Sequence, residues 1–380
     1  MGLSSFSKHF FSDCDTVLAE YRTRVGELRD ILRKRPIYNQ VHWTAAQSLE
    51  FRKYWREHFG KSISPRCHKY CQFFTKRFDV RYFPETLVTT GLFFHLNPYP
   101  LTNLLGGKEW CEILLAGSSE AFPGVRTPKT LGIRAGGYCY DSGRNLLSFD
   151  RLCTRICDES PCVILKPLAL SSGRGIEFYD LGNADGRASF QRSLKERPSF
   201  LVQEIQQTSE SLRTLYPNAV STFRVVTYVC GDEVFCCPSA LRVGSGGGKV
   251  DNIHAGGMCV GIDERTETLK STAYRLGYGS SYETFDTHPD TSISFDSYKI
   301  PGFAGILQAA RKLHGKLCRL GLIAWDFSLG PQNEPVLIEI NLSAPGTAFL
   351  QIANDQPLFG ANTEKMIMLA SGRRRSVSTS

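Results

Sequence analysis

Two short runs of mostly hydrophobic positions, each interrupted by a few polar residues, lie near the C-terminus. They cover residues 321–329 and 335–341, and the turn-forming sequence Gly-Pro-Gln-Asn lies between them. Their length and the turn predict the two strands of an antiparallel hairpin. Because side chains alternate along a strand, Glu339 and Asn341 share one face, and the hairpin can bring them to Asp326 of the first strand.

Helical periodicity marks the N-terminal part of the chain. Apolar residues recur at helical spacing over residues 15–33, with charged residues between them. Thr44 and Gln47 form the pattern of a capping box that opens a second helix, which Gly60 would end. The same periodicity predicts another helix over residues 303–320.

Further strands are expected in the middle of the chain. Short apolar runs at residues 162–166 and 200–205 each have the length of a strand. A long hairpin is predicted from residues 222–229 and 234–243, joined at a Gly-Asp turn. Pro238 would place the second of these strands at a sheet edge or a bulge.

The hairpin of the first paragraph carries oxygen-bearing side chains on otherwise apolar strands. A carboxylate such as Asp326 or Glu339 inside a buried strand is costly unless a cation meets it. Two carboxylates and the amide oxygen of Asn341 are hard ligands that suit Mg²⁺. The pattern therefore predicts a metal site, with a salt bridge to a nearby lysine or arginine as the alternative.

Two other segments carry candidate ligand-binding residues. Lys166 ends a strand, and the small residues of 170–176 follow it, so a phosphate could meet both the ammonium and loop N–H groups. An exposed hairpin is the alternative. Gln203, Glu204 and Ile205 suit a hinge whose backbone meets adenine, and an edge strand explains them equally well.

Arg224 and Arg242 each interrupt an apolar strand. An arginine in that position either pairs with a structural carboxylate or clamps an anionic ligand. The glycine-rich residues 244–248 follow and lead to Asn252 and His254. This segment favours a mobile loop near a ligand, and a disordered turn is the alternative.

Composition places the chain among globular proteins. Its 380 residues, 42% of them hydrophobic and 22% charged, leave room for two or three lobes. The thirteen cysteines show no paired zinc spacing, which favours a reduced, cytoplasmic protein with free thiols. No leader and no apolar run of membrane-spanning length is visible, so we expect no transmembrane segment.

The formal net charge of +8 is concentrated in residues 51–81. This stretch contains nine lysines and arginines but only two acidic residues, Glu57 and Asp79. This excess favours an anionic partner such as a nucleotide sugar, an acidic glycan or a membrane surface, and a solvated helix face is the alternative. Core packing explains the interleaved aromatic residues better than base stacking, so nucleic acid is not the expected partner.

The order of these parts resembles the ATP-grasp superfamily. The resemblance is carried by Leu165-Lys166-Pro167, Gln203-Glu204, Phe223-Arg224-Val225, Asn252-x-His254-x-Gly256-Gly257, Trp325-Asp326 and Glu339-Ile-Asn341. Several strings look more narrowly like the sugar-transfer-associated ATP-grasp family, namely Ser221-Thr-Phe-Arg-Val-Val-Thr227, Leu241-Arg-Val, Val250-Asp-Asn252, His288-Pro-Asp-Thr291 and Ala324-Trp-Asp326.

The resemblance implies an α+β ATP-grasp fold in which ATP lies between two α+β lobes. We expect a helical N-terminal region at residues 1–85 and the N-terminal ATP-grasp lobe at 86–200. The C-terminal lobe with the metal site would cover residues 201–365, and a disordered tail would occupy 371–380.

It also implies roles for single residues. ATP would be bound by Lys108, Lys166, Gly173, Gly175, Gln203, Glu204 and Ile205. Mg²⁺, with Mn²⁺ as a substitute, would be held by Asp326, Glu339 and Asn341. The catalytic residues would be Arg224, Arg242, Asn252 and His254. No base for the amine stands out, and His254 and His288 are candidates that a structural role explains as well.

The leading hypothesis is an ATP- and Mg²⁺-dependent carboxylate–amine ligase that acts through an acylphosphate. Its substrates would be a small, plausibly carbohydrate-linked, carboxylate and an amino acid or other amine. A second hypothesis keeps the ATP site but phosphorylates a small molecule or sugar, as a kinase does. A third is a non-catalytic glycan-binding module, against which the intact set of Asp326, Glu339, Asn341 and Lys166 argues.

Overall fold

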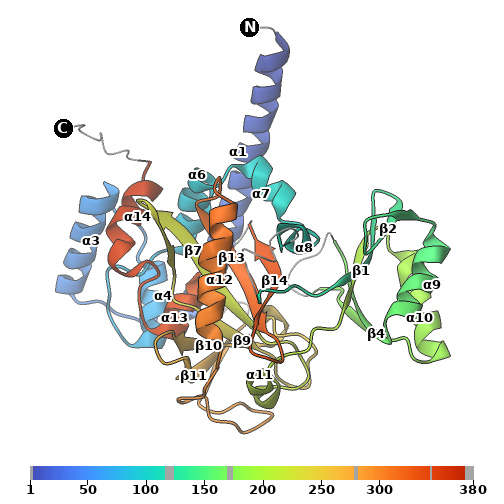
Figure 1. The fold of residues 1–380 in the computed structure, drawn as a ribbon. Coiled ribbons are helices and arrows are strands. Elements are labelled where there is room, and N and C mark those ends of the chain that lie inside the picture. Colours follow the sequence, from blue (N-terminus) through green and yellow to red (C-terminus); the bar gives the residue numbers. More distant parts are fainter. Residues whose placement is uncertain (1–2, 116–123, 169–173, 278–280, 343–344, 373–380) are drawn as a thin grey trace.

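The computed structural model describes residues 3–115, 124–168, 174–277, 281–342 and 345–372. Its strands form two separate sheets of antiparallel pairs with helices packed on them, so the predicted α+β class is confirmed. Figure 1 shows the smaller sheet with its two helices, in green, to one side of a larger lobe that contains the second sheet.

The smaller lobe contains a six-stranded sheet of order β3-β2-β1-β6-β4-β5. Its strands are β1 (Thr130–Ala135), β2 (Tyr138–Asp141), β3 (Leu146–Leu147), β4 (Cys162–Lys166), β5 (Glu177–Asp180) and β6 (Phe200–Glu204). Helices α9 (Phe149–Glu159) and α10 (Ala184–Glu196) share one hydrophobic core with it. The lobe boundary expected between residues 200 and 201 falls inside β6, because β6 pairs with β1 and β4 of this sheet.

The larger lobe contains an eight-stranded sheet of order β12-β11-β10-β9-β7-β13-β14, with β8 beside β7. Its strands are β7 (Thr222–Cys230), β8 (Glu233–Cys236), β9 (Ala240–Val243), β10 (Met258–Asp263), β11 (Thr268–Leu276), β12 (Tyr282–Phe285), β13 (Leu322–Leu329) and β14 (Pro335–Asn341). The single strand expected over residues 234–243 is interrupted: Pro238 lies between β8 and β9, which both pair with β7, and β9 is an interior strand of the sheet.

Helices surround this sheet and build its core. They are α5 (Glu85–Leu87), η1 (Val88–Phe93), α6 (Phe94–Leu96), α7 (Tyr99–Leu105), α8 (Trp110–Leu115), α11 (Glu210–Leu215), η2 (Ile253–Ala255), α12 (Phe303–Lys316), α13 (Ala348–Asn354), η3 (Gly360–Asn362) and α14 (Thr363–Ala370). The extension of α12 to Leu320 was wrong. The helix ends at Lys316, and the His314 imidazole contacts the Leu320 carbonyl at 2.8 Å.

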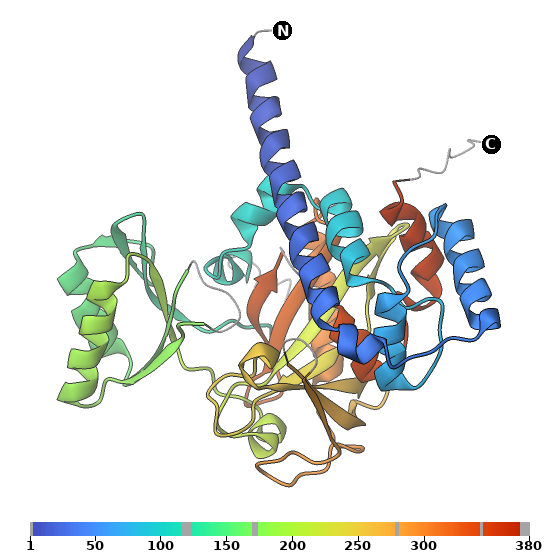
Figure 2. The ribbon, with the colours of Figure 1, turned by 180° about the vertical axis from the view of Figure 1, so that it is seen from behind.

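The N-terminal region is helical, as expected. It contains α1 (Leu3–Arg33), α2 (Arg35–Tyr38), α3 (Ala45–Phe59) and α4 (Arg66–Thr75). The capping box of α3 is confirmed: Thr44 Oγ1 accepts from the Gln47 amide at 3.2 Å, and Gly60 ends the helix with φ 87°. Figure 2 shows the N-terminal half of α1 projecting from the molecule, while its C-terminal half lies against the larger lobe.

None of the helices in the described part of the chain is long and apolar enough to cross a membrane. The twelve cysteines whose side chains are described are all free thiols, and most of them are buried.

Candidate active site

The β13–β14 hairpin brings the predicted residues together. Asp326 lies directly opposite Glu339 in the register of the two strands, and Ala324 lies opposite Asn341. On its other side β13 pairs with β7, and there the residue opposite Asp326 is Arg224. Asp326 therefore stands between an acidic neighbour on one strand and a cationic neighbour on the other.

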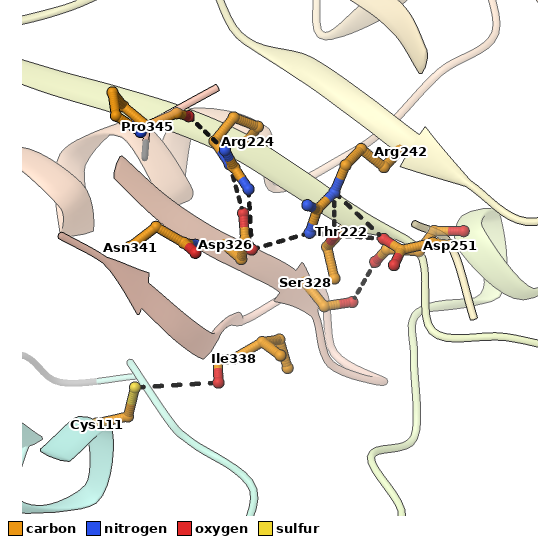
Figure 3. A network of polar contacts seen from close by, with 11 residues as sticks. Cys111, Thr222, Arg224, Arg242, Asp251, Asp326, Ser328, Ile338, Asn341 and Pro345 are labelled. Atoms are coloured by element: carbon orange, nitrogen blue, oxygen red, sulfur yellow. Dashed lines mark hydrogen bonds and ion pairs between the residues drawn. The ribbon is translucent and has the colours of Figure 1, made fainter. Parts of the chain in front are cut away.

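Two arginines bind the Asp326 carboxylate (Figure 3). Arg224 Nε donates to Oδ1 at 2.7 Å, and Arg242 Nη2 meets Oδ2 at 2.9 Å. The amide nitrogen of Asn341 donates to the same Oδ2 at 3.0 Å. Burial opposes ionisation of Asp326, but the two guanidinium groups outweigh it and hold its pKa at about 2. The ion pair that was the alternative to a metal ligand is thus present at Asp326.

Arg242 has further partners that sequence reasoning did not assign. Its guanidinium donates to Thr222 Oγ1, from Nε at 3.0 Å, and Thr222 in turn donates to Asp251. The Asp251 carboxylate lies 3.6 Å from Arg242 Nε, and burial raises its pKa despite that charge. In the sequence, Asp251 follows the glycine-rich loop. A carboxylate that follows two strands with buried arginines was the signal that could have predicted this pairing.

Glu339 has a different environment from Asp326. It is partly buried and forms no ion pair with a lysine or arginine of the described residues. Burial and the nearby charge of Asp326 raise its pKa. A carboxylate that resists ionisation until a cation arrives is suited to hold one.

These side chains fit a divalent cation of the Mg²⁺ type. Glu339 and Asn341 both line the cavity, and Asn341 keeps its Oδ1 as a ligand because its nitrogen faces Asp326. The described residues contain no cluster of three His, Cys, Asp or Glu side chains that could hold a metal by itself. Mg²⁺ is usually bound by one or two carboxylates together with substrate phosphates, which matches this small set.

Lys166, at the end of β4, is 9% exposed. Its Nζ donates to Gln203 Oε1 at 2.7 Å, and Gln203 is fixed by Pro128 and Thr130. Burial lowers the pKa of Lys166 to about 8, although the charge of Glu339 acts against that shift. Gln203 therefore orients Lys166 but does not itself line the cavity, whereas Lys166, Glu204 and Ile205 do.

The other predicted ATP contacts have mixed outcomes. Lys108 lies in the turn before α8 rather than on a helix, and its Nζ donates to the Pro167 carbonyl at 3.4 Å. Glu204 Oε1 accepts from the Lys129 amide at 3.2 Å. Gly175 has φ 70°, a backbone conformation that favours glycine, and Gly173 lies outside the described residues.

Most of these residues line one cavity of about 590 Å³. Its volume falls in the range of small-molecule sites, about 300–1,000 Å³. The predicted site residues that line it are Lys108, Lys166, Glu204, Ile205, Arg224, Arg242, Asn252, Asp326, Glu339 and Asn341. Asp251 and Thr222 line it as well.

The histidines contribute less than expected. His254 lies on η2, and its side chain is outside the described set. His288 is fully buried, contacts the Gly244 carbonyl at 2.9 Å and does not line the cavity, so it has a structural role. The glycine-rich loop is fastened at both ends, since Tyr216 also donates to the Gly248 carbonyl at 2.8 Å.

The basic residues of 51–81 lie elsewhere. They belong to α3, α4, the connection between these helices and the segment after α4, and none of them lines the cavity. Lys69 stands 5.4 Å from the ring centroid of Trp43, and Arg81 binds Asp79 at 2.8 Å. These basic residues therefore do not contribute to the cavity, and an anionic partner for them stays a prediction.

Two lobes with a cavity of this composition define a protein of the ATP-grasp class. The sequence profile of the sugar-transfer-associated ATP-grasp family matches residues 90–365, well over half of the chain. The chain therefore belongs to that family, and the predicted ATP-grasp fold is confirmed.

Solved structures with similar folds are distant. VanG D-Ala:D-Ser ligase from Enterococcus faecalis is 12% identical, with a TM-score of 0.40. The superposition covers 71% of this chain and 61% of the VanG chain. The ATP-grasp ligase PsnB, solved with a precursor peptide and AMPPNP, is 15% identical with a TM-score of 0.39, covering 73% of this chain and 63% of its own. A search of curated proteins gave no match.

Proposed function

We propose that the protein is an ATP-dependent ligase that joins a carboxylate to an amine through an acylphosphate. The observation that supports it is the convergence of Lys166, Arg224, Arg242, Glu339 and Asn341 on one cavity. Family membership supports ATP-dependent ligation in general. The carbohydrate-linked acid expected from the sequence is the substrate class that we propose to test first.

The cationic side chains have defined tasks in this proposal. Lys108 and Lys166 would contact the phosphates of ATP, and the backbone around Glu204 and Ile205 would meet the adenine. Arg224, held by Asp326, and Arg242, held by Asp326 and Thr222, present guanidinium groups to the charge that develops on the transferred phosphoryl group. Phosphoryl transfer depends mainly on such positioning and charge neutralisation.

A divalent cation held by Glu339 and Asn341 would supply further neutralisation of the phosphate charge when it is bound. The carboxylate oxygen of the acid attacks the γ-phosphorus, and ADP leaves. The amine nitrogen then attacks the acyl carbon, phosphate leaves, and the nitrogen loses a proton to give the amide. The arginines stay in place through both steps, because Asp326 fixes them from inside the sheet.

An isotope experiment tests the proposal. The protein is incubated with ATP, Mg²⁺ and a panel of ¹⁸O-labelled carboxylic acids that includes uronic acids, with hydroxylamine as a general nucleophile. We expect ADP, a hydroxamate and phosphate that carries one ¹⁸O atom from the acid. A product heavier by one phosphoryl group, formed with ADP and without labelled phosphate, would instead identify a kinase. A protein that does not bind ATP would contradict both enzyme hypotheses, and the non-catalytic glycan-binding module would be the remaining one.

A further inference from the structure

The N-terminal helix α1 turns a mainly polar face toward the rest of the molecule. It packs on α2, α5, α7 and η1. Most of its part-buried side chains are polar or small, namely Thr16, Ala19, Glu20, Thr23, Glu27 and Asp30. Ile31 is apolar and packs against the core between α2 and α4. A surface helix normally packs its apolar stripe on the core, and over most of the described length of α1 that arrangement is reversed.

The apolar side chains of α1 form a stripe on its outward face. The outward stripe consists of Val17, Leu18, Tyr21, Val25, Leu28 and Leu32. From Leu18 onward these residues recur at spacings of three and four, which places them along one side of a helix. Val17 is 65% exposed and Tyr21 is 64% exposed. Five of the twelve exposed large apolar residues in the described chain lie here, and such a concentration marks an interaction site.

Arginines flank the outward stripe on both sides. Arg22 and Arg29 each directly follow a residue of the stripe and lie on one side of it, whereas Arg24 precedes one and lies on the other. All three arginines are exposed. On these flanks the acidic residues are Asp15, at the start of the stripe, and Glu20, which pairs with Arg24 at 3.1 Å. The outward face therefore combines an apolar centre with positively charged edges.

A second copy of this chain fits the outward stripe poorly. If two α1 helices paired in parallel, Arg24 of one would face Arg29 of the other. In an antiparallel pair, Arg22 would face Arg22 or Arg29 of the other copy, and like charges repel. The described stripe also spans only about two heptads, fewer than the roughly three to four of a sustained coiled coil. An anionic surface would instead attract these arginines.

A membrane with anionic headgroups meets both features of this face. Amphipathic helices with basic edges lie in the plane of the membrane interface, with their apolar side chains at the boundary between headgroups and acyl chains. Figure 2 shows α1 in front of the larger lobe, with its N-terminal half beyond the lobe, so a flat surface can approach the helix from outside.

We propose that α1 binds the surface of an anionic membrane through the outward stripe. Arg22, Arg24 and Arg29 then contact lipid phosphates, while their aliphatic stems lie beside the stripe. The helix lies on the membrane and does not cross it. This inference concerns a surface outside the cavity and does not depend on the proposed ligase activity.

Co-sedimentation of the full-length protein with lipid vesicles tests the proposal. Vesicles of phosphatidylcholine mixed with phosphatidylglycerol are compared with vesicles of phosphatidylcholine alone, at low and at high salt. We expect the wild-type protein to bind the anionic vesicles about tenfold or more tightly than the neutral ones. High salt should remove most of that difference, because it screens the charges of the arginines.

Two double variants separate the apolar and the charged contributions. The first combines Leu18→Gln with Leu28→Gln, and the second combines Arg22→Gln with Arg29→Gln. Each should weaken binding to the anionic vesicles about tenfold or more, since each removes one part of the contact. All four positions are exposed, so both variants should keep the fold, which circular dichroism and urea unfolding check.

Matched controls carry the same substitutions elsewhere on the surface. Leu49→Gln changes a leucine of α3 that is 62% exposed, and Arg192→Gln changes an exposed arginine of α10. Both control variants should bind the anionic vesicles as tightly as the wild-type protein.

Three results would overturn the proposal. In the first, the wild-type protein binds neither kind of vesicle, or binds both equally. In the second, the folded leucine variant binds the anionic vesicles as tightly as the wild type. In the third, sedimentation velocity without vesicles shows a wild-type dimer that the leucine variant converts to a monomer, and no vesicle binding is seen. That last result would assign the outward stripe to a second copy of the chain.

Discussion

The two strands of the β13–β14 hairpin provide opposite environments for the same kind of side chain. Asp326 on β13 is 3% exposed, holds two arginines and has its pKa lowered to about 2. Glu339, directly across from it on β14, lies at the cavity and has its pKa raised. The sequence presents both as carboxylates in apolar strands. Their neighbours make Asp326 an anchor for the arginines and leave Glu339 for an incoming cation.

The largest effect is expected for Asp326→Asn. Removing the charge leaves Arg224 and Arg242 buried without their shared counter-ion, which costs about 3–5 kcal/mol when a buried pair is broken. Urea unfolding should report that loss, and turnover should vanish with it. Asp296→Asn, at an exposed position, is the control and should change stability by about 0.5 kcal/mol or less. An Asp326→Asn protein of wild-type stability would remove the anchor role.

Glu339→Gln sharpens the contrast, because its cost should fall on activity alone. The fold already disfavours the ionised carboxylate, so the neutral amide should leave the free energy of unfolding within about 0.5 kcal/mol or raise it. The rate of ADP formation at fixed Mg²⁺ should fall about a hundredfold or more, which is roughly 3 kcal/mol of barrier. Glu233→Gln, exposed on β8, serves as the control. Full activity in the Glu339→Gln variant would exclude Glu339 from cation binding.

The elements that the sequence predicted correctly are those set by residues close together in the chain. Thr44, Gln47 and Gly60 interact within a single helix, so the capping box and the helix end could be read directly. The two strands of the β13–β14 hairpin could also be predicted from their length and the short turn, but Asp326 lies opposite Glu339 only because the register shifts by one residue between Asp326 and Phe327. The order of such local units also carried the resemblance to the ATP-grasp superfamily.

What failed depended on contacts between distant segments. The Arg224–Asp326 pair joins residues 102 positions apart, and only the β7–β13 register reveals it. The early end of α12 at Lys316 is a local exception: the His314 imidazole contacts the Leu320 carbonyl six residues further along the chain, and apolar periodicity does not predict that contact. No sequence pattern predicted that residues of α1, such as Glu27, line the cavity. They reach it because the N-terminal helices pack on the larger lobe.

The smallest predicted effect concerns Lys166 and pH. Its pKa of about 8 in the free protein should rise when a triphosphate binds, so binding takes up a proton above pH 8. Affinity for an ATP analogue should then be independent of this group below pH 8. Above it, affinity should fall by up to about tenfold per pH unit, the limit for one proton.

Lys166→Met isolates that contribution. The variant should bind the analogue more weakly at pH 7 and lose the decline between pH 8 and 10, because no titrating group remains at the position. Lys195→Met, exposed on α10, should keep both the affinity and the decline. Calorimetric titrations across the pH range measure the slope directly. A decline that persists in the Lys166→Met variant would assign it to another group, and Lys166 would then not meet the phosphates.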